Sequence, residues 1–314
     1  EAGIVGMGGA GFPTHVKLNP PKDTKIDCVI LNGAECEPYL TCDDTTMRTT
    51  PEKVVQGLKL CMKAVNAPKG YVAIEDNKPG AIDAVEKAMG DDPDLAVAVL
   101  KTKYPQGDEK QIIFAVTGRQ VPTGKLPANV GVVVSNVGTA CAVADAVYYG
   151  KPLYERLVTV TGKGVKNPKN VLVPFGTRIK DVVEFTGGYS CEPGKIIFGG
   201  PMMGVAQYSD EAVTDKRNNG ILVLTGEEAA PKRVDPCIRC GKCVDVCPMQ
   251  LEPNYLAAAS KAENWTVADS YHVTTCIECG SCSYVCPAKR PLTEYIRYGK
   301  RTVMAQQRAA AMKK

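Results

Sequence analysis

This chain has little histidine and no long uninterrupted run of apolar residues. His15 and His272 are its only histidines in 314 residues, which disfavours zinc sites built on imidazole ligands. The most apolar stretch, residues 130–147, is broken by Asn136 and Asp145, whereas a membrane-spanning helix needs about 20 apolar residues. No positively charged start followed by an apolar core suggests a signal peptide. We therefore expect a folded chain without a transmembrane helix, and a segment that precedes it, because it begins with Glu rather than Met.

Low-complexity tracts are also missing, and the composition is that of an ordinary globular protein. Apolar residues make up 44% and charged residues 23% of the chain, and the length suggests two or three domains. The formal net charge of +4 does not by itself indicate a nucleic-acid partner. Fourteen cysteines, in a chain long enough to bury a core without disulfides, favour a reducing cytoplasm.

Cysteine is abundant, and eight of the fourteen cysteines form two copies of one pattern near the C-terminus. The copies are Cys237-x2-Cys240-x2-Cys243-x3-Cys247-Pro248 and Cys276-x2-Cys279-x2-Cys282-x3-Cys286-Pro287. This spacing is typical of bacterial ferredoxins, in which the short gaps curl the backbone so that three sulfurs face one 4Fe-4S cluster. Zinc ribbons use pairs rather than triplets of cysteine, and a disulfide framework suits a small secreted domain. The doubled pattern therefore predicts two 4Fe-4S clusters.

The fourth cysteine of each run is set apart by the longer gap and is followed by proline. In two-cluster ferredoxins this cysteine ligates the other cluster. We therefore assign one cluster to Cys237, Cys240, Cys243 and Cys286, and the other cluster to Cys276, Cys279, Cys282 and Cys247.

Residues 1–150 alternate between short apolar runs and stretches with helical spacing. The expected strands are residues 26–31, 70–75, 94–102 and 131–135. The expected helices between them are residues 51–65, 79–89 and 108–116. Strands separated by helices of this length predict a parallel α/β sheet.

The pattern changes at residue 151, and the rest of the chain divides into two parts. Residues 151–226 carry short β-type runs and one brief helix, which predicts a small α+β insert. Its expected elements are strands at residues 157–161, 171–174, 196–198 and 221–224 and a helix at 179–185. Residues 227–314 begin with a linker at 227–232 and contain the cysteine runs, a helix-like stretch at 254–263 and a long C-terminal helix at 292–312.

A glycine-rich segment, GMGGAGFPT at residues 6–14, opens the chain. Glycines allow positive φ angles and close approach, which a backbone wrapped around a phosphate needs. The match to G-x-G-x-x-G is weak by itself, since no strand precedes it and Pro13 follows where a Rossmann helix would continue. A plain glycine-rich turn is the alternative.

Four segments in order resemble the NADH-oxidising flavoprotein subunit of respiratory complex I and related hydrogenases. They are the glycine segment with Lys17, LNGAECEP at 31–38 (N-A-D-E-x-E-P in that family), YPQGDE at 104–109 (Y-x-x-G-E-E) and SNVGT at 135–139 (N-N-V-E-T). Combined with two ferredoxin runs, the chain resembles the C subunits of Rnf complexes, the ion-translocating ferredoxin:NAD oxidoreductases. The resemblance implies an FMN/NADH-binding domain at residues 1–150, a β-grasp domain at 151–226 and a two-cluster ferredoxin-type domain at 227–314.

The resemblance also implies roles for single residues. Gly6, Gly8, Gly9 and Gly11 would hold the FMN phosphate region through backbone amides, and Lys17 would supply a cation to the flavin. Asn32 and Asn136 would hydrogen-bond the flavin or its phosphate. Phe12 would stack on the nicotinamide nucleotide, Glu37, Asp108 and Glu109 would meet its ribose and amide groups, and Tyr104 would lie beside the flavin. Each has a plainer alternative, such as a core residue, a surface charge or a helix N-terminal acid.

The chain departs from the complex I pattern at three places, and we expect these departures to change flavin affinity or tuning. Met7 replaces arginine, Ala34 replaces aspartate and Gly138 replaces glutamate. The six remaining cysteines, Cys28, Cys36, Cys42, Cys61, Cys141 and Cys191, have no metal-ligand spacing, and we expect most of them to be small buried residues.

The resemblance implies an oxidoreductase subunit that passes electrons between NAD(H), FMN and the clusters. A flavin accepts a hydride and releases electrons singly, so no side-chain acid or base is needed and we assign no catalytic residue. The implied partners are the membrane subunits and the ferredoxin-like B subunit, with ferredoxin indirectly, at the cytoplasmic face of the bacterial membrane. Two alternatives stay open: a cobalamin reductase of a bacterial microcompartment, and a non-enzymatic electron wire or scaffold with a vestigial flavin loop.

Overall fold

The computed structural model describes residues 1–21 and 23–312, and the chain forms two compact units. The first unit is Glu1–Ala229 and the second is Ala230–Lys314. The boundary expected near residue 150, between the flavin and β-grasp domains, lies inside the first unit and stays a prediction.

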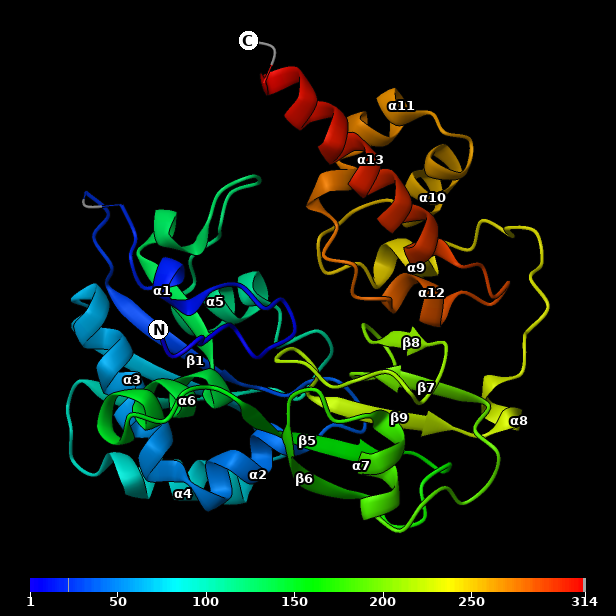
Figure 1. The fold of residues 1–314 in the computed structure, drawn as a ribbon. Helices are drawn as coiled ribbons and strands as arrows, with labels where there is room; N and C mark the ends of the chain where they lie inside the picture. Colours follow the sequence, from blue (N-terminus) through cyan, green and yellow to red (C-terminus); the bar gives the residue numbers. More distant parts are fainter. Residues whose placement is uncertain (22, 313–314) are drawn as a thin grey trace. The chain divides into compact units, whose positions relative to one another are not determined.

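The first unit begins with a parallel sheet of four strands in the order β3-β2-β1-β4 (Figure 1). The strands are β1 (Cys28–Gly33), β2 (Lys69–Glu75), β3 (Leu95–Leu100) and β4 (Val132–Asn136). The surrounding helices are α1 (Thr14–Lys17), α2 (Cys42–Thr49), α3 (Pro51–Val65), α4 (Pro79–Met89), α5 (Glu109–Thr117), the 3-10 turn η1 (Pro127–Val130) and α6 (Val137–Tyr149). The expected parallel α/β sheet is confirmed.

Helices cover both faces of this sheet because alternate residues of each strand point to opposite sides. In β1, Val29 and Leu31 join the core beneath α3, α4 and α6, whereas Ile30 joins the core beneath α5. Figure 1 shows α3 and α4 on one side of the strands and α5 on the other. Helices α3 and α6 pack closely: a Cβ at Gly57 would collide with the carbonyl group of Ala140.

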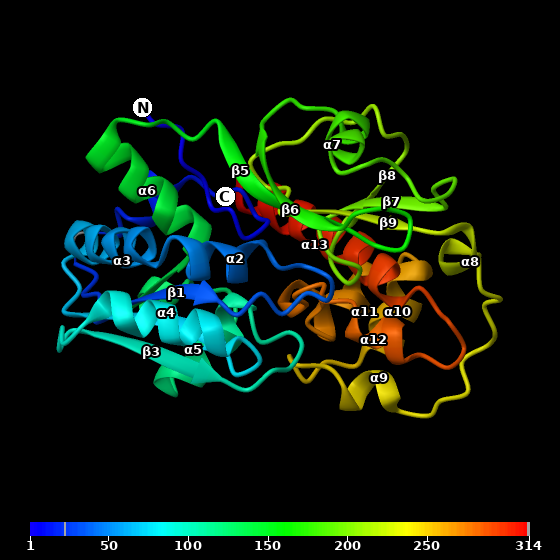
Figure 2. The ribbon, with the colours of Figure 1, turned by 90° about the horizontal axis from the view of Figure 1, so that it is seen from below.

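A second sheet of five strands follows in the same unit, in the order β6-β5-β9-β7-β8. Its elements are β5 (Glu155–Thr161), β6 (Lys169–Pro174), α7 (Ile179–Phe185), β7 (Lys195–Phe198), β8 (Val205–Gln207), β9 (Gly220–Leu224) and the short α8 (Gly226–Ala229). Strands β5 and β9 are parallel, and the other pairs are antiparallel. Helix α7 packs Ile179 and Val183 on one face of this sheet (Figure 2). The expected α+β insert is confirmed, with β8 as an additional strand.

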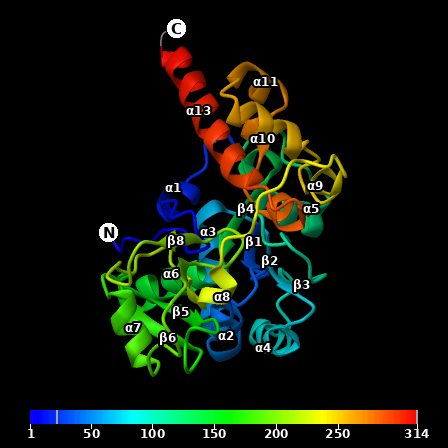
Figure 3. The same cartoon turned by 90° about the vertical axis from the view of Figure 1, so that its right-hand side faces the viewer.

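The second unit is built from helices and carries both cysteine runs. The helices are α9 (Lys242–Asp245), α10 (Pro253–Lys261), α11 (Trp265–Ser270), the 3-10 turn η2 (Val273–Thr275), α12 (Ser281–Val285) and α13 (Leu292–Met312). Leu256 of α10 and Ile296 and Val303 of α13 form its core, and α13 lies along α10 and α11 (Figure 3). Within residues 1–21 and 23–312, no helix has the length and apolar character needed to span a bilayer.

Candidate functional site

Four strand ends of the first sheet gather most of the predicted flavin and nucleotide residues. The carboxyl ends of parallel strands share one edge of a sheet, which is where α/β proteins bind ligands. A cavity of about 480 Å³ opens beyond β1, β2 and β3. Its lining comes from residues 35–41 and 44 after β1, Glu75, Asn77 and Lys78 at the end of β2, and residues 102–104 after β3. Of the predicted residues, Glu37 and Tyr104 line this cavity.

The glycine loop, residues 6–11, is a closed turn held to the start of α6. The Gly6 amide donates to the Phe12 carbonyl at 2.8 Å, and the Gly11 amide donates to the Gly6 carbonyl at 3.1 Å. The Met7 amide donates to Oγ1 of Thr139 at 2.9 Å. The loop therefore lies at the carboxyl end of β4, beside Asn136, and open space lies next to Gly9, where a backbone can approach a phosphate closely.

Asn32 and Asn136 are register partners at the ends of β1 and β4. The Asn32 amide nitrogen donates to the Gly107 carbonyl at 2.7 Å, which ties the loop after β3 to β1. The Asn136 side chain caps α6 by accepting from the Gly138 amide at 2.9 Å, and it donates to Asp43 at 2.7 Å. The structure thus brings the two asparagines together and gives each a structural partner. Their contact with flavin stays a prediction.

Lys17 reaches the same edge of the sheet from helix α1. Its Nζ donates to Glu109 Oε1 at 2.8 Å and to the Val134 carbonyl of β4 at 3.0 Å. The pair neutralises both charges, and each side chain keeps a third or more of its surface exposed. Lys17 and Glu109 therefore form one site on the structure, although 92 residues separate them in the chain.

The remaining predicted nucleotide residues occupy different surroundings. Phe12 is 47% exposed beside the glycine loop. Asp108 caps α5 by accepting from the amides of Lys110 and Gln111, as its helix N-terminal alternative requires. Glu37 accepts from the Met202 and Met203 amides of the β7–β8 turn at 3.1 and 2.7 Å, so it links the cavity to the second sheet. Their nucleotide contacts stay predictions.

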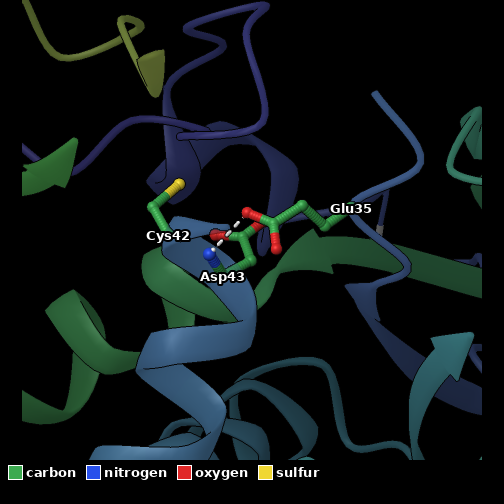
Figure 4. Close-up of side chains that lie close together, drawn as sticks. All are labelled: Glu35, Cys42 and Asp43. Carbon is green, nitrogen blue, oxygen red and sulfur yellow. Dashed lines mark hydrogen bonds between the residues drawn. The ribbon is translucent and has the colours of Figure 1, made fainter. Parts of the chain in front are cut away.

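A cluster that the sequence did not single out lies between the cavity and Asn136 (Figure 4). Ligand atoms of Glu35, Cys42 and Asp43 lie within 4.8 Å of one another. Both Glu35 oxygens accept from backbone amides at the start of α2, at 2.7 and 3.0 Å. Burial, with the nearby Asp43 carboxylate as a second cause, raises the pKa of Glu35 to about 8. Glu35 belongs to the segment at residues 31–38 that resembles the complex I family, but its neighbours in space are set by the tertiary fold.

Glu75 and Lys78 form a second pair that sequence reasoning missed. The Glu75 side chain is 2% exposed, and burial raises the pKa of its carboxyl group. Lys78 Nζ lies 3.4 Å from Glu75 and donates to the Ala34 carbonyl at 2.8 Å. A charged pair directly after a buried strand was the signal that could have found it, since strand ends line such cavities.

In the second unit, one small cavity collects four of the cluster cysteines. Cys247, Cys276, Cys279 and Cys282 line a space of about 20 Å³, which is the ligand set assigned to the second cluster. Burial raises the pKa of the Cys276 thiol to about 11. Because an iron cluster requires thiolates, its insertion at this site would release protons.

Three of the other four cysteines, Cys237, Cys243 and Cys286, lie near one another in the same unit. The electrostatic neighbours of Cys243 include Cys237 and Cys286, which places members of both runs together. Cys237 and Cys240 are exposed, whereas Cys286 is buried. Sulfur donors from crossed runs fit two 4Fe-4S clusters. The individual assignments stay predictions.

Family models match three successive parts of the chain. Residues 1–145 match the Nuo51 FMN-binding domain, residues 157–206 the SLBB domain and residues 232–290 the 4Fe-4S dicluster domain. FMN and 4Fe-4S clusters are thereby confirmed as the cofactors, and NAD(H) fits the Nuo51 fold. The SLBB and dicluster matches confirm the remaining parts of the expected fold class.

Solved structures agree with this fold. The NAD+-reducing [NiFe]-hydrogenase in the H2-reduced state matches with a TM-score of 0.64 and 19% identity, over 95% of this chain and 58% of that chain. Its air-oxidised state matches with a TM-score of 0.61 and 21% identity, over 88% and 50%. At these identities the likeness concerns the fold.

Curated relatives match nearly the whole chain. The C subunit of the Na(+)-translocating ferredoxin:NAD(+) oxidoreductase complex of Acetobacterium woodii is 54% identical over 98% of this chain and 70% of its own length. The C subunit of the proton-translocating complex of Clostridium ljungdahlii is 53% identical over 95% and 65%. The C subunit of the ion-translocating oxidoreductase complex of Pectobacterium atrosepticum is 41% identical over 100% and 46%. The chain therefore spans about half to 70% of these relatives, and it belongs to the family of C subunits of ion-translocating oxidoreductase complexes.

Proposed function

We propose that this chain is the electron-transfer part of a ferredoxin:NAD oxidoreductase subunit that passes electrons between NAD(H), FMN and two 4Fe-4S clusters. The observation that carries the proposal is that this one chain contains both a flavin-type domain and a two-cluster domain. Its relative at 54% identity is named as a subunit of a ferredoxin:NAD(+) oxidoreductase complex. A flavin converts a hydride into single electrons, and the clusters pass single electrons on. Neither domain type alone provides both functions.

The chain's contribution to the flavin reaction is positioning. The amides of Gly8 and Gly9 would hold the FMN phosphate region, while Gly6 and Gly11, whose amides donate within the loop, would shape it. Asn32 and Asn136 would hydrogen-bond the flavin. Lys17, which pairs with Glu109 at the same edge of the sheet, would supply a cation to the flavin. Glu37, which lines the cavity, would meet the nicotinamide nucleotide together with Phe12, Asp108 and Glu109. Tyr104, which lines the same cavity, would lie beside the flavin. No side chain needs to transfer a proton for the hydride to move.

The eight cysteines of the two runs would ligate two clusters, each of which accepts one electron at a time. Cys276, Cys279, Cys282 and Cys247 would ligate one cluster, with Cys237, Cys240, Cys243 and Cys286 on the other. Hydrogen bonds to the sulfurs and solvent exposure set cluster potentials, so the two sites are expected to differ in potential.

The partners in this proposal are the other subunits of a membrane-bound, ion-translocating complex. The relatives are named as C subunits of such complexes, which supports peripheral association through partner subunits. We place the chain at the cytoplasmic face of the membrane, next to the membrane subunits and a ferredoxin-like B subunit that exchanges electrons with ferredoxin.

Cofactor analysis of anaerobically purified protein tests the proposal. We expect one FMN and about eight irons per chain, and NADH-dependent reduction of an artificial dye. Protein that binds neither FMN nor NADH would favour a scaffold with a vestigial flavin loop. Corrinoid reduction by a chain that does not co-purify with membrane subunits would favour a cobalamin reductase.

A further inference from the structure

A buried arginine of the second sheet reaches the glycine loop. Arg156 is the second residue of β5, and its side chain is 4% exposed. One guanidinium nitrogen donates to the Met7 carbonyl at 3.0 Å and to the Lys216 carbonyl at 2.8 Å. Burial of a guanidinium group is unfavourable in free energy unless its donors are hydrogen-bonded. These two carbonyls therefore stabilise the buried Arg156 side chain. A single side chain thus ties the loop to the second sheet.

Both backbone polar groups of Met7 are hydrogen-bonded. Its amide donates to Thr139 of α6 in the first domain, and its carbonyl accepts from Arg156 of β5. Gly6 and Gly8, two of the predicted phosphate-binding residues, flank it. Because glycines supply no side-chain contacts, the position of the Gly8 amide depends on how Met7 is anchored, whereas the Gly6 amide is also held by the Phe12 carbonyl.

The turn that contains Lys216 packs against the same loop. Lys216 Nζ donates to the Gly3 carbonyl at 2.6 Å. A Cβ at Gly11 would lie 2.9 Å from Cδ of Arg217, so the stem of Arg217 covers one side of the loop. Since Arg156 holds the Lys216 carbonyl and the Met7 carbonyl together, it sets the distance between this turn and the glycine loop.

Arg156 also acts on the acid that positions Asn136. Asp43 is 8% exposed, and burial raises the pKa of its carboxyl group, while the charge of Arg156 opposes that rise. Asp43 accepts the hydrogen bond from the Asn136 amide group at 2.7 Å. The charge of Arg156 therefore favours the ionised form of the carboxyl group that accepts from Asn136.

We propose that Arg156 is a positioning residue of the flavin site, through which the second sheet fixes the glycine loop. The flavin part of this inference rests on the proposed function. The second sheet then acts as a structural part of the flavin site.

Hydrogen exchange of the full chain without added FMN tests the loop itself. In Arg156→Met, the amides of Gly6, Met7 and Gly11 should exchange about tenfold faster than in wild type, while β9 keeps its protection. Arg178→Met is the matched control: Arg178 lies in the same domain, but its partners are Asp181 and Glu211 on the surface. Loop exchange equal to that of the control would overturn the proposal. If β9 also loses protection, Arg156→Lys decides, since it keeps the charge without the guanidinium fork.

FMN binding supplies the second readout. Quenching of FMN fluorescence should show a dissociation constant raised about tenfold in Arg156→Met, less in Arg156→Lys and not at all in Arg178→Met. FMN affinity within twofold of wild type in Arg156→Met would overturn the role in flavin binding. If wild-type protein binds no FMN, the proposed function fails, and the exchange rates still decide whether Arg156 positions the loop.

Discussion

The two cysteine runs have the same spacing and the same backbone but different surroundings. Equivalent positions 39 residues apart adopt left-handed conformations: Arg239 and Glu278 at φ 55° and 58°, and Gly241 and Gly280 at 80° and 81°. Yet Cys237 and Cys240 of the first run are exposed, whereas Cys279 of the second is buried. Ligand geometry is therefore a local property of each run, and solvent access is a property of the packing around it.

Helix α13 accounts for much of this difference. Glu278 of the second run pairs with Arg297 at 2.7 Å and with Lys300 at 3.1 Å, and Lys300 also donates to the Cys276 carbonyl at 2.7 Å. The equivalent residue of the first run, Arg239, carries the opposite charge and stands on an exposed stretch. Helix α13 therefore contacts the second run, where Glu278 is the partner of two of its cations.

The largest expected effect comes from the crossed ligands. Cys247→Ala and Cys286→Ala should each lower the iron content from about eight to about four per chain, because each residue ligates the cluster of the other run. Electron paramagnetic resonance of the reduced protein identifies the cluster that remains. The spectrum that remains in Cys247→Ala should match the one that remains in Cys276→Ala, because both residues are assigned to the same cluster. A residual spectrum equal to that of Cys237→Ala would show that each run holds its own cluster.

Removal of iron should separate the runs by exposure. Under anaerobic treatment with a chelator, the cluster at Cys237 and Cys240 should be lost about tenfold faster than the cluster in the buried cavity, because solvent reaches its sulfurs. Loss of absorbance should show two phases. Cys286→Ala, with the second cluster alone, should show only the slow phase, and a single rate in wild type would contradict the comparison.

Breaking the ion pairs of Glu278 should have a smaller effect. Glu278→Gln should lower the free energy of unfolding of the second unit by about 1 kcal/mol, since the partly exposed pairs connect the cysteine run to α13. Trp265, the only tryptophan, lies in α11 and reports this unit during urea denaturation. Arg239→Gln at the equivalent position is the control and should leave the midpoint unchanged. An equal loss of unfolding free energy in both variants would show that the ion pairs with α13 are not the cause of the destabilisation.

The smallest effect concerns one hydroxyl group. Thr293 Oγ1 lies 3.5 Å from the Cys282 sulfur. Thr293→Val should lower the midpoint potential of the second cluster alone, because a hydrogen bond to a ligand sulfur stabilises the reduced cluster. Redox titration measures the shift, with unchanged iron content. Thr302→Val on the same helix, where the hydroxyl bonds the Tyr298 carbonyl, should leave both potentials unchanged.

Helices with strong amphipathic spacing were predictable from the sequence. Residues 51–65, 79–89, 179–185 and 292–312 form helices with the expected bounds. Helix α2 was missed because its Thr- and Asp-rich sequence has low helix propensity, and its first amides are held by Glu35, a long-range partner. Helix α6 was missed because its apolar sequence lacks a clear period.

Local spacing along the chain determined the α/β alternation, the glycine loop and the doubled cysteine pattern, because each depends on dihedral preferences and on distances between near neighbours. Tertiary structure alone decided which groups meet. It placed Arg156 on the Met7 carbonyl, 149 residues away, and Glu37 on the β7–β8 turn. It also left Cys237 and Cys240 of the first run exposed and buried Cys279 and Cys286 of the second. Such contacts depend on how sheets and helices pack, and no local pattern specifies a partner so far along the chain.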